Sequence, residues 1–567
     1  MTSSLLYALI SVSVKDGIDQ FARNLVELGF SIISSGGTYR YLKEHDIAVT
    51  SVEEFRQTSL IRRLTAANNA KPEQERIPEQ NIHWASQIAG QHAEIHGVLL
   101  ATTAMADQLE ALGMVRISLV CVDYYALHAE LERPDATIAS IIEAIDVGGP
   151  TQATAASKGG RIVVSTPEDR QETINWLRAG RPNEEEFVTR SIAKALANNL
   201  AYYAPLVERL SGGDYSVLVL ERAQKLGYAE NRWMGGADLM RRFGSKDRAA
   251  KGALSTFRRK EGSEPGYINY TDADGGRRLI ARIENFYRKN GLSIPAIAVG
   301  LKHGNPCGVG IADFDTGAGM LRAIRNMVAG NPGALFGGTV MTNFVIDDEA
   351  AALLRTYLTG KQKRPIDAVW APTVTDCAVA QLRRVNNRCR MMVSSSFSYG
   401  TTELSVAKRF RQLEADEFLR QGPGDQVFNL NDPHLTKLGR LTKRQRMDML
   451  LGLAICGAAN SNTIVITKNG MMLGLGLCQN SRVVACEHAV NGARRCGHNI
   501  RGSVAVSDSF FPFNDGPRKL IRAGVGAIFA TSGSLNDKAF RTLCRGRKRR
   551  VNVVMGPDEM FRMFCKH

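Results

Sequence analysis

The sequence lacks the features that would place it in a membrane or outside the cell. It has no apolar run of roughly 18 or more residues, the length that a transmembrane helix needs. Its start, MTSSLLYALISVSVKDG, has neither the basic lead nor the small-residue cleavage site of a secretory signal. There is no low-complexity segment and no repeat of short fixed period. We therefore expect a soluble, cytoplasmic globular protein.

The ten cysteines lack the regular spacing of a disulfide framework, so we expect free thiols in a reducing compartment. One cluster, Cys486-Glu-His488 with Cys496-Gly-His498, has the composition of a Cys2His2 zinc site. A single residue separates the two ligands in each half, whereas zinc sites use longer spacers. No metal site is predicted.

Basic residues outnumber acidic ones, 72 to 56, which gives a formal net charge of +16. This excess suits an enzyme with phosphorylated or polyanionic substrates, and it also permits a nucleic-acid partner. The densest basic run, RGRKRR at 545–550, contains no aromatic residue. We interpret it first as a solvated loop and second as a nucleic-acid or targeting patch.

A chain of 567 residues exceeds what one hydrophobic core usually organises, so two or more domains are expected. A helical stretch, EEEFVTRSIAKALANNLAYYAPLVERL, ends at the glycine-rich SGGD of 211–214. We predict a first domain over residues 1–211 and a second over 212–567. The polar segment at 54–90 is expected to be a long loop or insertion.

The first 46 residues alternate between strand and helix patterns. LLYALISVS reads as a buried strand, DGIDQFARNLVELG as an amphipathic helix, FSIISSGGT as a strand and turn, and YRYLKEHD as a helix. This order is typical of a parallel α/β sheet with its ligand site at the carboxyl ends of the strands. The turns SVSVK and SSGGT both lie between a strand and a helix, where hydroxyls, glycine amides and a helix N-terminus favour phosphate.

Two further stretches carry candidate proton-transfer groups. The stretch IDVGGPTQATAASK supplies Asp146, a tight Gly-Gly-Pro turn and Lys158. If Asp146 and Lys158 lie at the same strand-end face, they can hold a proton donor and its counter-ion together. KHGNPCGVG places Lys302 beside His303 where an apolar run ends. That pair is either a turn exposed to water or a proton-handling pair with its backbone fixed by the residues that follow.

These motifs, in this order, resemble the AICAR transformylase/IMP cyclohydrolase family over nearly the whole chain. The resemblance implies a methylglyoxal-synthase-like parallel α/β fold for the first domain, which closes the purine ring. The residues it implies at the nucleotide there are Ser11, Ser13, Lys15, Ser35, Gly36, Gly37, Thr38 and Asp123. For ring closure itself it implies Asp146, Lys158 and Tyr125.

The first domain departs from the family pattern at four positions. Gln87, Ala89, Asp123 and Val14 stand where the family has Arg, Lys, Asn and Asp. The loss of two cations predicts weaker binding of a dianionic phosphate. Three interpretations stay open: an inactive ring-closure site, a different ligand, or replacement cations from the insertion, such as Arg62 and Arg63.

The second domain carries a longer series of family motifs. They are KHGNPCGVG, PGYINYTDA, LFGG, IDAVWAP, NSNTIVITKNGMMLGLGLCQNSRV, SDSFFPFNDG and TSGSLND, in that order. The resemblance implies a transformylase region of two cytidine-deaminase-like α/β subdomains without the catalytic zinc. Two departures are Gly227, where the family has Arg, and Cys478, where it has Gly; Arg232 is a candidate replacement for the former.

The resemblance also implies roles in formyl transfer. The amine of AICAR is conjugated with its ring, so it needs a base, and His303 is the candidate because imidazole titrates near neutral pH. Lys302 would stabilise the oxyanion or protonate the leaving nitrogen, and Asn462 would orient the carboxamide. The implied nucleotide residues are Tyr228, Asn269, Gly337, Asp367, Phe510 and Arg562. The implied folate residues are Arg482, Val483, Asp515, Ser534 and Leu535.

We therefore predict a homodimeric enzyme of de novo purine biosynthesis. It would transfer a formyl group from 10-formyltetrahydrofolate to AICAR, giving FAICAR, and close FAICAR to IMP, with no metal required. The alternatives are a paralogue acting on an AICAR-like nucleotide and a transformylase whose cyclohydrolase domain is inactive. A non-catalytic, basic nucleic-acid-binding descendant is the alternative of another class.

Overall fold

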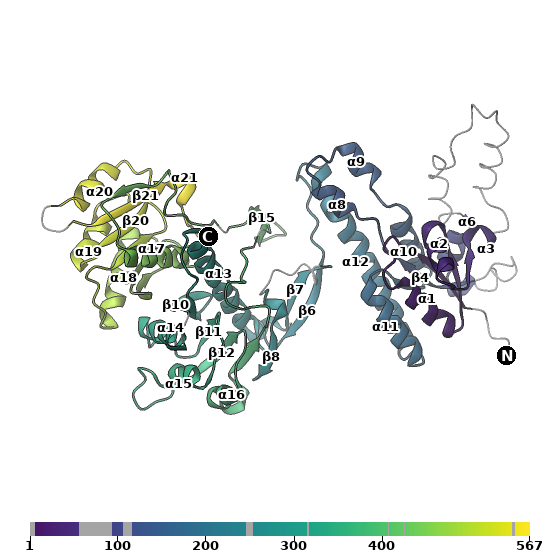
Figure 1. The fold of residues 1–567 in the computed structure, drawn as a ribbon, viewed down its shortest axis with the longest axis horizontal. Coiled ribbons are helices and arrows are strands. Elements are labelled where there is room, and N and C mark those ends of the chain that lie inside the picture. The colour runs from purple at the N-terminus through teal and green to yellow at the C-terminus, as the bar shows by residue number, and fades with distance from the viewer. Residues whose placement is uncertain are drawn as a thin grey trace. The chain divides into compact units, whose positions relative to one another are not determined.

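The computed structural model describes residues 6–55, 93–105, 116–244, 253–314, 317–405, 407–424, 426–546 and 550–566. The chain forms two compact units (Figure 1). Unit 1 comprises Met1–Glu221 and Arg242–Lys246, and unit 2 comprises Arg222–Arg241 and Asp247–His567. Three sets of residues lie outside the described part of the chain: the candidate replacement cations Arg62 and Arg63, the departures Gln87 and Ala89, and residues 547–549 of the basic run.

Unit 1 is built on a parallel sheet whose strand order is β3-β2-β1-β4-β5. The strands are β1 (Leu6–Ser11), β2 (Phe30–Ser34), β3 (Val49–Ser51), β4 (Ile117–Val122) and β5 (Ile162–Val164). Side chains alternate between two cores, so that Ala8 and Ile10 face one side of the sheet and Leu9 the other. A sheet buried on both faces explains why its strands read as continuous apolar runs.

Helices cover both faces of this sheet. α1 (Ile18–Glu27) and α11 (Pro167–Arg178) contribute to one core, and α6 (Ala93–Leu100) and α10 (Gly148–Lys158) to the other. The remaining helices are α2 (Gly36–Glu44), α3 (Val52–Phe55), α8 (Leu127–Glu132), α9 (Ile138–Glu143) and α12 (Glu184–Leu210). From β1 the chain adds β2 and β3 on one side, and it later adds β4 and β5 on the other side. The strand order therefore reverses between β1 and β4, and parallel sheets of this kind bind ligands at the carboxyl ends of the strands at such a switch point.

Unit 2 is built on a twelve-stranded mixed sheet, ordered β16-β21-β20-β19-β17-β18-β10-β9-β11-β12-β13-β8. Its first half has β8 (Arg258–Glu261), β9 (Ala296–Lys302), β10 (Asn305–Ala312), β11 (Gly338–Thr342), β12 (Ile366–Ala371) and β13 (Arg390–Val393). Its second half has β16 (Thr436–Leu438), β17 (Ile464–Lys468), β18 (Met471–Gly476), β19 (Val504–Ser507), β20 (Ala527–Ser532) and β21 (Asn552–Pro557). The halves meet where β10 pairs with β18.

The two halves of unit 2 repeat one topology. In each, an antiparallel hairpin is followed by an antiparallel neighbour, two parallel strands and an antiparallel edge strand. The corresponding helices are α13 (Tyr267–Lys289) and α17 (Lys443–Cys456), α14 (Gly317–Gly330) and α18 (Arg482–Arg495), α15 (Asp348–Thr356) and α19 (Asp515–Ala523), and α16 (Asp376–Leu382) and α20 (Asp537–Cys544). α13 and α17 share one central core, and the other helices cover a separate core in each half.

Smaller elements complete the described chain. They are α21 (Asp558–Phe561) and two two-stranded sheets, β6 (Leu220–Leu226) with β7 (Ala237–Arg242) and β14 (Arg409–Gln412) with β15 (Phe418–Gln421). All ten cysteines are free thiols. Within the described residues, no helix is long and apolar enough to cross a membrane, and no cluster of His, Cys, Asp or Glu is placed to hold a metal ion.

Candidate functional site

The Lys-His pair lies at a tight hairpin turn in the first half of unit 2. Lys302 ends β9, Asn305 begins β10, and the two residues between them both have positive φ, 54° at His303 and 68° at Gly304. Two residues with φ above zero are the mark of a two-residue hairpin turn that matches the twist of its strands. His303 is exposed at this turn, whereas Lys302 is half-buried.

A buried carboxylate, which the sequence did not single out, holds this turn. Asp272 of α13 accepts a hydrogen bond from the backbone N–H of Gly304 at 2.6 Å and from the Thr339 hydroxyl at 2.9 Å. Burial raises the pKa of Asp272, and the two hydrogen bonds and the nearby His303 oppose that shift. The imidazole of His303 thus projects from a backbone that is fixed from inside the unit.

Lys302 is connected to the predicted nucleotide residues. Its Nζ donates to the carbonyl of Phe336 at 2.8 Å, next to Gly337, whose φ is 68°. A Cβ added at Gly337 would lie 4.0 Å from Oδ2 of Asp367. The structure therefore brings Lys302, Gly337 and Asp367 into one region.

Two arginines at this region were missed by the sequence analysis. Arg384 forms an ion pair with Asp367, and the guanidinium of Arg390 lies 5.7 Å from the ring centre of Tyr228. The Tyr228 hydroxyl in turn donates to Asn269 Oδ1 at 2.9 Å. The signal was present in the arginine-rich run RRVNNRCR at 383–390, and a pocket of about 520 Å³ there is lined by Arg355, Arg383, Arg384, Val385, Asn386 and Arg388.

The structure also explains the glycine at position 227. A Cβ there would lie 2.7 Å from the carbonyl oxygen of Glu264, so an arginine does not fit this backbone without a shift. The second departure, Cys478, has a φ of 56°, the left-handed region that favours glycine. Arg232, the candidate replacement for the absent arginine, belongs to the short helix η5 (Arg232–Met234).

The second half of unit 2 brings Asn462 towards the same turn. Asn460 donates its backbone N–H to Asn305 Oδ1 at 3.3 Å, which connects the loop before β17 to the residue that follows the His303-Gly304 turn. Asn462 donates to the carbonyl of Gln479 at 2.8 Å and accepts from Arg482 at 2.7 Å. The Ser461-Asn462 peptide bond is cis.

Arg482 is the centre of a buried network at the start of α18. Besides Asn462 it contacts the carbonyl of Phe510 at 2.9 Å and the carboxylate of Asp508 at 2.8 Å. Asp508 is fully buried and also accepts from the backbone N–H of Thr463 at 2.8 Å. The guanidinium, predicted on the folate side, therefore also fixes the orientation of the Asn462 carboxamide.

The C-terminal segment passes the same place. Lys566 donates from Nζ to the carbonyl of Gly304, and Cys565 donates its backbone N–H to Ser461 Oγ at 3.2 Å. Arg562, predicted at the nucleotide, pairs with Asp558 through Nε at 2.6 Å. Burial lowers the pKa of Lys566. Sequence reasoning missed Lys566 because no motif surrounds it.

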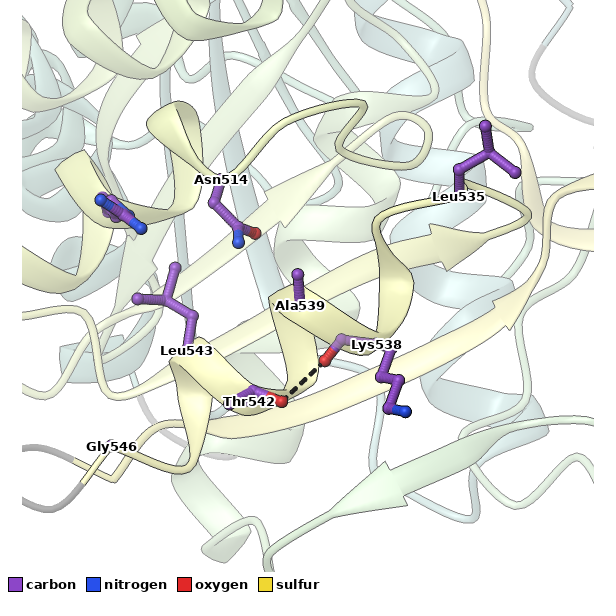
Figure 2. A pocket seen from close by; sticks show the side chains of 8 residues that line it. Asn514, Leu535, Lys538, Ala539, Thr542, Leu543 and Gly546 are labelled. Carbon is purple, nitrogen blue, oxygen red and sulfur yellow. Dashed lines mark hydrogen bonds between the residues drawn. The ribbon is translucent and has the colours of Figure 1, made fainter.

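The predicted folate residues cluster around the N-termini of helices. Val483 is the second residue of α18, Asp515 begins α19, and Ser534 and Leu535 lie in the loop between β20 and α20. A pocket of about 630 Å³ lies beside them. In Figure 2, Asn514 lies at its upper left and Leu535 at its upper right, with the α20 residues Ala539 and Thr542 below. Its lining residues are Asn514, Arg518, Leu535, Lys538, Ala539, Thr542, Leu543 and Gly546. Four of these eight lining residues are polar or charged, including the cations Arg518 and Lys538.

Unit 1 gathers charged groups at the switch point between β1 and β4. Asp123, directly after β4, accepts from the backbone N–H of Ser13 and, at 3.3 Å, from that of Val14. Arg170 of α11 lies 3.4 Å from the same carboxylate. Lys15 donates to Thr38 Oγ1 at 3.1 Å. Burial raises the pKa of Asp123, which the two amides and Arg170 oppose.

The remaining predicted residues of this edge lie at the same strand ends. Ser11 ends β1, and Ser35, Gly36 and Gly37 form the start of α2, where a Cβ at either glycine would meet open space. Their exposed backbone leaves room for a ligand. Arg170 was missed because it comes from a helix far along the chain.

Asp146 and Tyr125 are neighbours, but Lys158 is not beside them. Asp146 accepts from the backbone N–H of Tyr125 at 3.2 Å and of Gly149 at 3.0 Å, and burial raises its pKa. The hydroxyl of Tyr202 accepts from the backbone N–H of Asp146 at 2.8 Å. Lys158 ends the 11-residue helix α10, about 16 Å along its axis from the end that follows Asp146.

The prediction that Asp146 and Lys158 lie at the same strand-end face is therefore wrong, because they lie at opposite ends of α10. The physical reason is that α10 is a crossover helix. It begins near the carboxyl end of β4 and delivers the chain to the amino end of β5, so its two ends lie at opposite edges of the sheet.

Two α/β units that each collect charged side chains at strand ends define a two-domain enzyme for small anionic substrates. The family model described as AICARFT/IMPCHase bienzyme matches residues 158–492, and the model of the MGS-like domain matches residues 17–151. The chain belongs to the AICARFT/IMPCHase bienzyme family. The predicted family, fold class and role in purine biosynthesis are confirmed.

The chain is similar to three curated proteins named bifunctional purine biosynthesis protein PurH. That of Anoxybacillus flavithermus is 28% identical, with 94% of this chain and 95% of the relative covered. That of Aquifex aeolicus is 28% identical, with 95% and 96% covered, and that of Polynucleobacter asymbioticus is 26% identical, with 94% and 95% covered. Among solved structures, a crystal structure of ForH is 25% identical and covers 37% of this chain and 100% of that chain, with a TM-score of 0.29.

Proposed function

We propose that unit 2 transfers a formyl group from 10-formyltetrahydrofolate to the amine of AICAR, giving FAICAR and tetrahydrofolate. The observation that carries this proposal is the convergence on one hairpin turn. His303 projects from the turn, Lys302 leads to the Gly337 and Asp367 region, and the loop of Asn462 is hydrogen-bonded to Asn305.

The chemistry needs a base, because the AICAR amine is conjugated and poorly nucleophilic. The amine nitrogen attacks the formyl carbon while His303 accepts its proton, either directly or through the adjacent carboxamide. The oxyanion that forms is stabilised by the ammonium of Lys302. When the bond from the formyl carbon to the folate nitrogen breaks, the proton that His303 accepted passes to that nitrogen, and tetrahydrofolate leaves. Asn462 holds the carboxamide, and Arg482 holds Asn462.

The nucleotide occupies the side with Tyr228, Asn269, Gly337, Asp367, Phe510 and Arg562 in this proposal. Arg384 and Arg390 supply cationic charge for the phosphate, since no arginine fits at position 227. The folate occupies the side with Arg482, Val483, Asp515, Ser534 and Leu535, where Leu535, Ala539 and Leu543 of the pocket in Figure 2 offer apolar contacts for its rings. No metal ion takes part.

Unit 1 closes FAICAR to IMP in this proposal. The nucleotide would lie at the strand-end turns that contain Ser11, Ser13, Lys15, Ser35, Gly36, Gly37 and Thr38. Asp146 and Tyr125 would transfer protons in ring closure. Two observations support this role: the Asp146 carboxyl accepts from the Tyr125 backbone N–H, and burial raises the pKa of Asp146. No role follows for Lys158 within its own chain.

The enzyme is proposed to act as a cytoplasmic homodimer. The β14–β15 sheet exposes Phe410, Phe418 and Leu419, an apolar surface of the kind found at subunit contacts. Light scattering on the purified protein measures this directly, and a monomer at micromolar concentration would contradict it.

Incubation of the purified protein with AICAR and 10-formyltetrahydrofolate tests the central proposal. Release of tetrahydrofolate is expected, and its absence together with tight, salt-sensitive RNA binding would favour the nucleic-acid-binding alternative. Supplied FAICAR tests unit 1 separately. FAICAR that accumulates without conversion to IMP would identify a transformylase with an inactive cyclohydrolase domain.

A further inference from the structure

The anion-binding turn of unit 1 already holds an anion from its own chain. The carboxylate of Asp123 accepts from the backbone N–H groups of Ser13 and Val14 and pairs with Arg170. Backbone amides between a strand and a helix, together with a guanidinium, are the donors that bind phosphate groups in other proteins. We call these donors, with Lys15, the cradle.

The cradle is a built site. The side chain of Arg170 is 8% exposed, and its Nη1 is held at 2.8 Å by the carbonyl of Asp16. Lys15 is fixed by the carbonyl of Val12 and the hydroxyl of Thr38. These contacts hold both cations at the turn, and Asp123 lies among them because β4 ends beside β1 in the parallel sheet.

We propose that Asp123 is an internal competitor for phosphate, so that a phosphorylated ligand enters unit 1 only when this carboxylate leaves the cradle. A phosphate dianion and an ionised carboxylate cannot share the two amides and one guanidinium, because both are acceptors and they repel each other. Asp123 thereby sets the selectivity of the site against dianions. The inference rests on the proposed use of this edge as the nucleotide site.

Inorganic phosphate, titrated into the full-length protein and followed by calorimetry, is the direct probe. Asp123→Asn keeps the side-chain shape and removes the charge, so phosphate affinity is expected to rise about tenfold or more, the equivalent of one recovered charge-assisted hydrogen bond. Asp19→Asn is the matched control. It removes the same charge from a partly exposed residue in the first turn of α1, at the same edge of the sheet, that takes no part in the cradle, and its phosphate affinity is expected to equal that of the wild type.

The gain in phosphate affinity must also depend on Arg170 of the cradle. The double variant Asp123→Asn with Arg170→Gln is expected to lose this gain, whereas phosphate that binds elsewhere on the chain would keep the same affinity in the double variant. Asp123→Ser, which leaves the amides unoccupied, is the second variant if the first is poorly folded, and thermal unfolding without phosphate checks both. Equal phosphate affinity of wild type and Asp123→Asn, or an equal gain in Asp19→Asn, would overturn the inference.

IMP separates this inference from the proposed function. If the Asp123→Asn protein gains affinity for both phosphate and IMP, both stand. If it gains affinity for phosphate while IMP binds no more tightly than phosphate, the competitor role stands and the assignment of unit 1 as a nucleotide site fails.

Discussion

Removal of the Asp272 carboxylate is the sharpest test of how the His303 turn is held. Asp272 is 4% exposed and makes two hydrogen bonds, to Gly304 and Thr339. Asp272→Ala removes both, each worth about 1.5 to 3 kcal/mol when one partner is charged. Burial of the ionised carboxyl, which raises its pKa, offsets part of this. We expect the free energy of unfolding to fall by about 2 to 4 kcal/mol.

The repeated topology of unit 2 provides a matched control. Asp448 of α17 is 5% exposed and holds the corresponding turn of the second half, accepting from Asn469 at 2.9 Å and Gly470 at 2.8 Å. The φ values of Asn469 and Gly470, 53° and 75°, match those of His303 and Gly304. Asp448→Ala therefore removes an equivalent buried carboxylate from a turn that carries no proposed catalytic group.

The two variants are expected to be equally destabilised but to differ in formyl transfer. A displacement of His303 by about 1 Å costs on the order of a hundredfold in kcat, because the amine and its base must be aligned. We expect that loss in Asp272→Ala and near wild-type kcat in Asp448→Ala, measured by tetrahydrofolate release below both unfolding temperatures. Full kcat in Asp272→Ala, or an equal loss in Asp448→Ala, would refute the positioning role.

Five other substitutions, one of them a control, have distinct expected outcomes. His303→Ala should abolish formyl transfer but leave cyclisation of supplied FAICAR intact, and a coupled loss of both would contradict two separate sites. Arg390→Gln should raise the KM for AICAR about tenfold, while Arg325→Gln, at an exposed arginine of α14 that does not line the arginine pocket, should not. Gly227→Arg should lower the thermal unfolding temperature and not the KM for AICAR, since its Cβ meets a backbone carbonyl. Burial raises the pKa of the Glu284 carboxyl in the folded protein. The folded state therefore keeps its proton longer than the unfolded state, and the free energy of unfolding should fall as pH rises from about 4.3 through the folded pKa. Urea unfolding at several pH values should show this fall in the wild type and a flatter pH profile in Glu284→Gln.

Local patterns of the chain were sufficient for much of the fold. The apolar runs and amphipathic periods of the first 46 residues correspond to β1, α1, β2 and α2. The His303-Gly304 turn was equally readable, because a hairpin turn with positive φ depends on two adjacent residues. The duplication in unit 2 was predicted only through the family resemblance. Residue patterns do not reveal it, because the two halves share the arrangement of strands and helices but few residues, such as Lys302 and Lys468 at the two hairpin ends.

The tertiary structure decided which distant groups meet. Asp272, Arg384, Arg390 and Arg170 act on predicted residues from other elements of the sheet or its helices, and no spacing along the chain encodes those contacts. The same cause separates Asp146 from Lys158, because the helix between them crosses the sheet. The sequence by itself determined the elements, the turns and the family. The occupant of the unit 1 cradle, the carboxylate of Asp123, was decided only when parallel pairing brought the ends of β1 and β4 together.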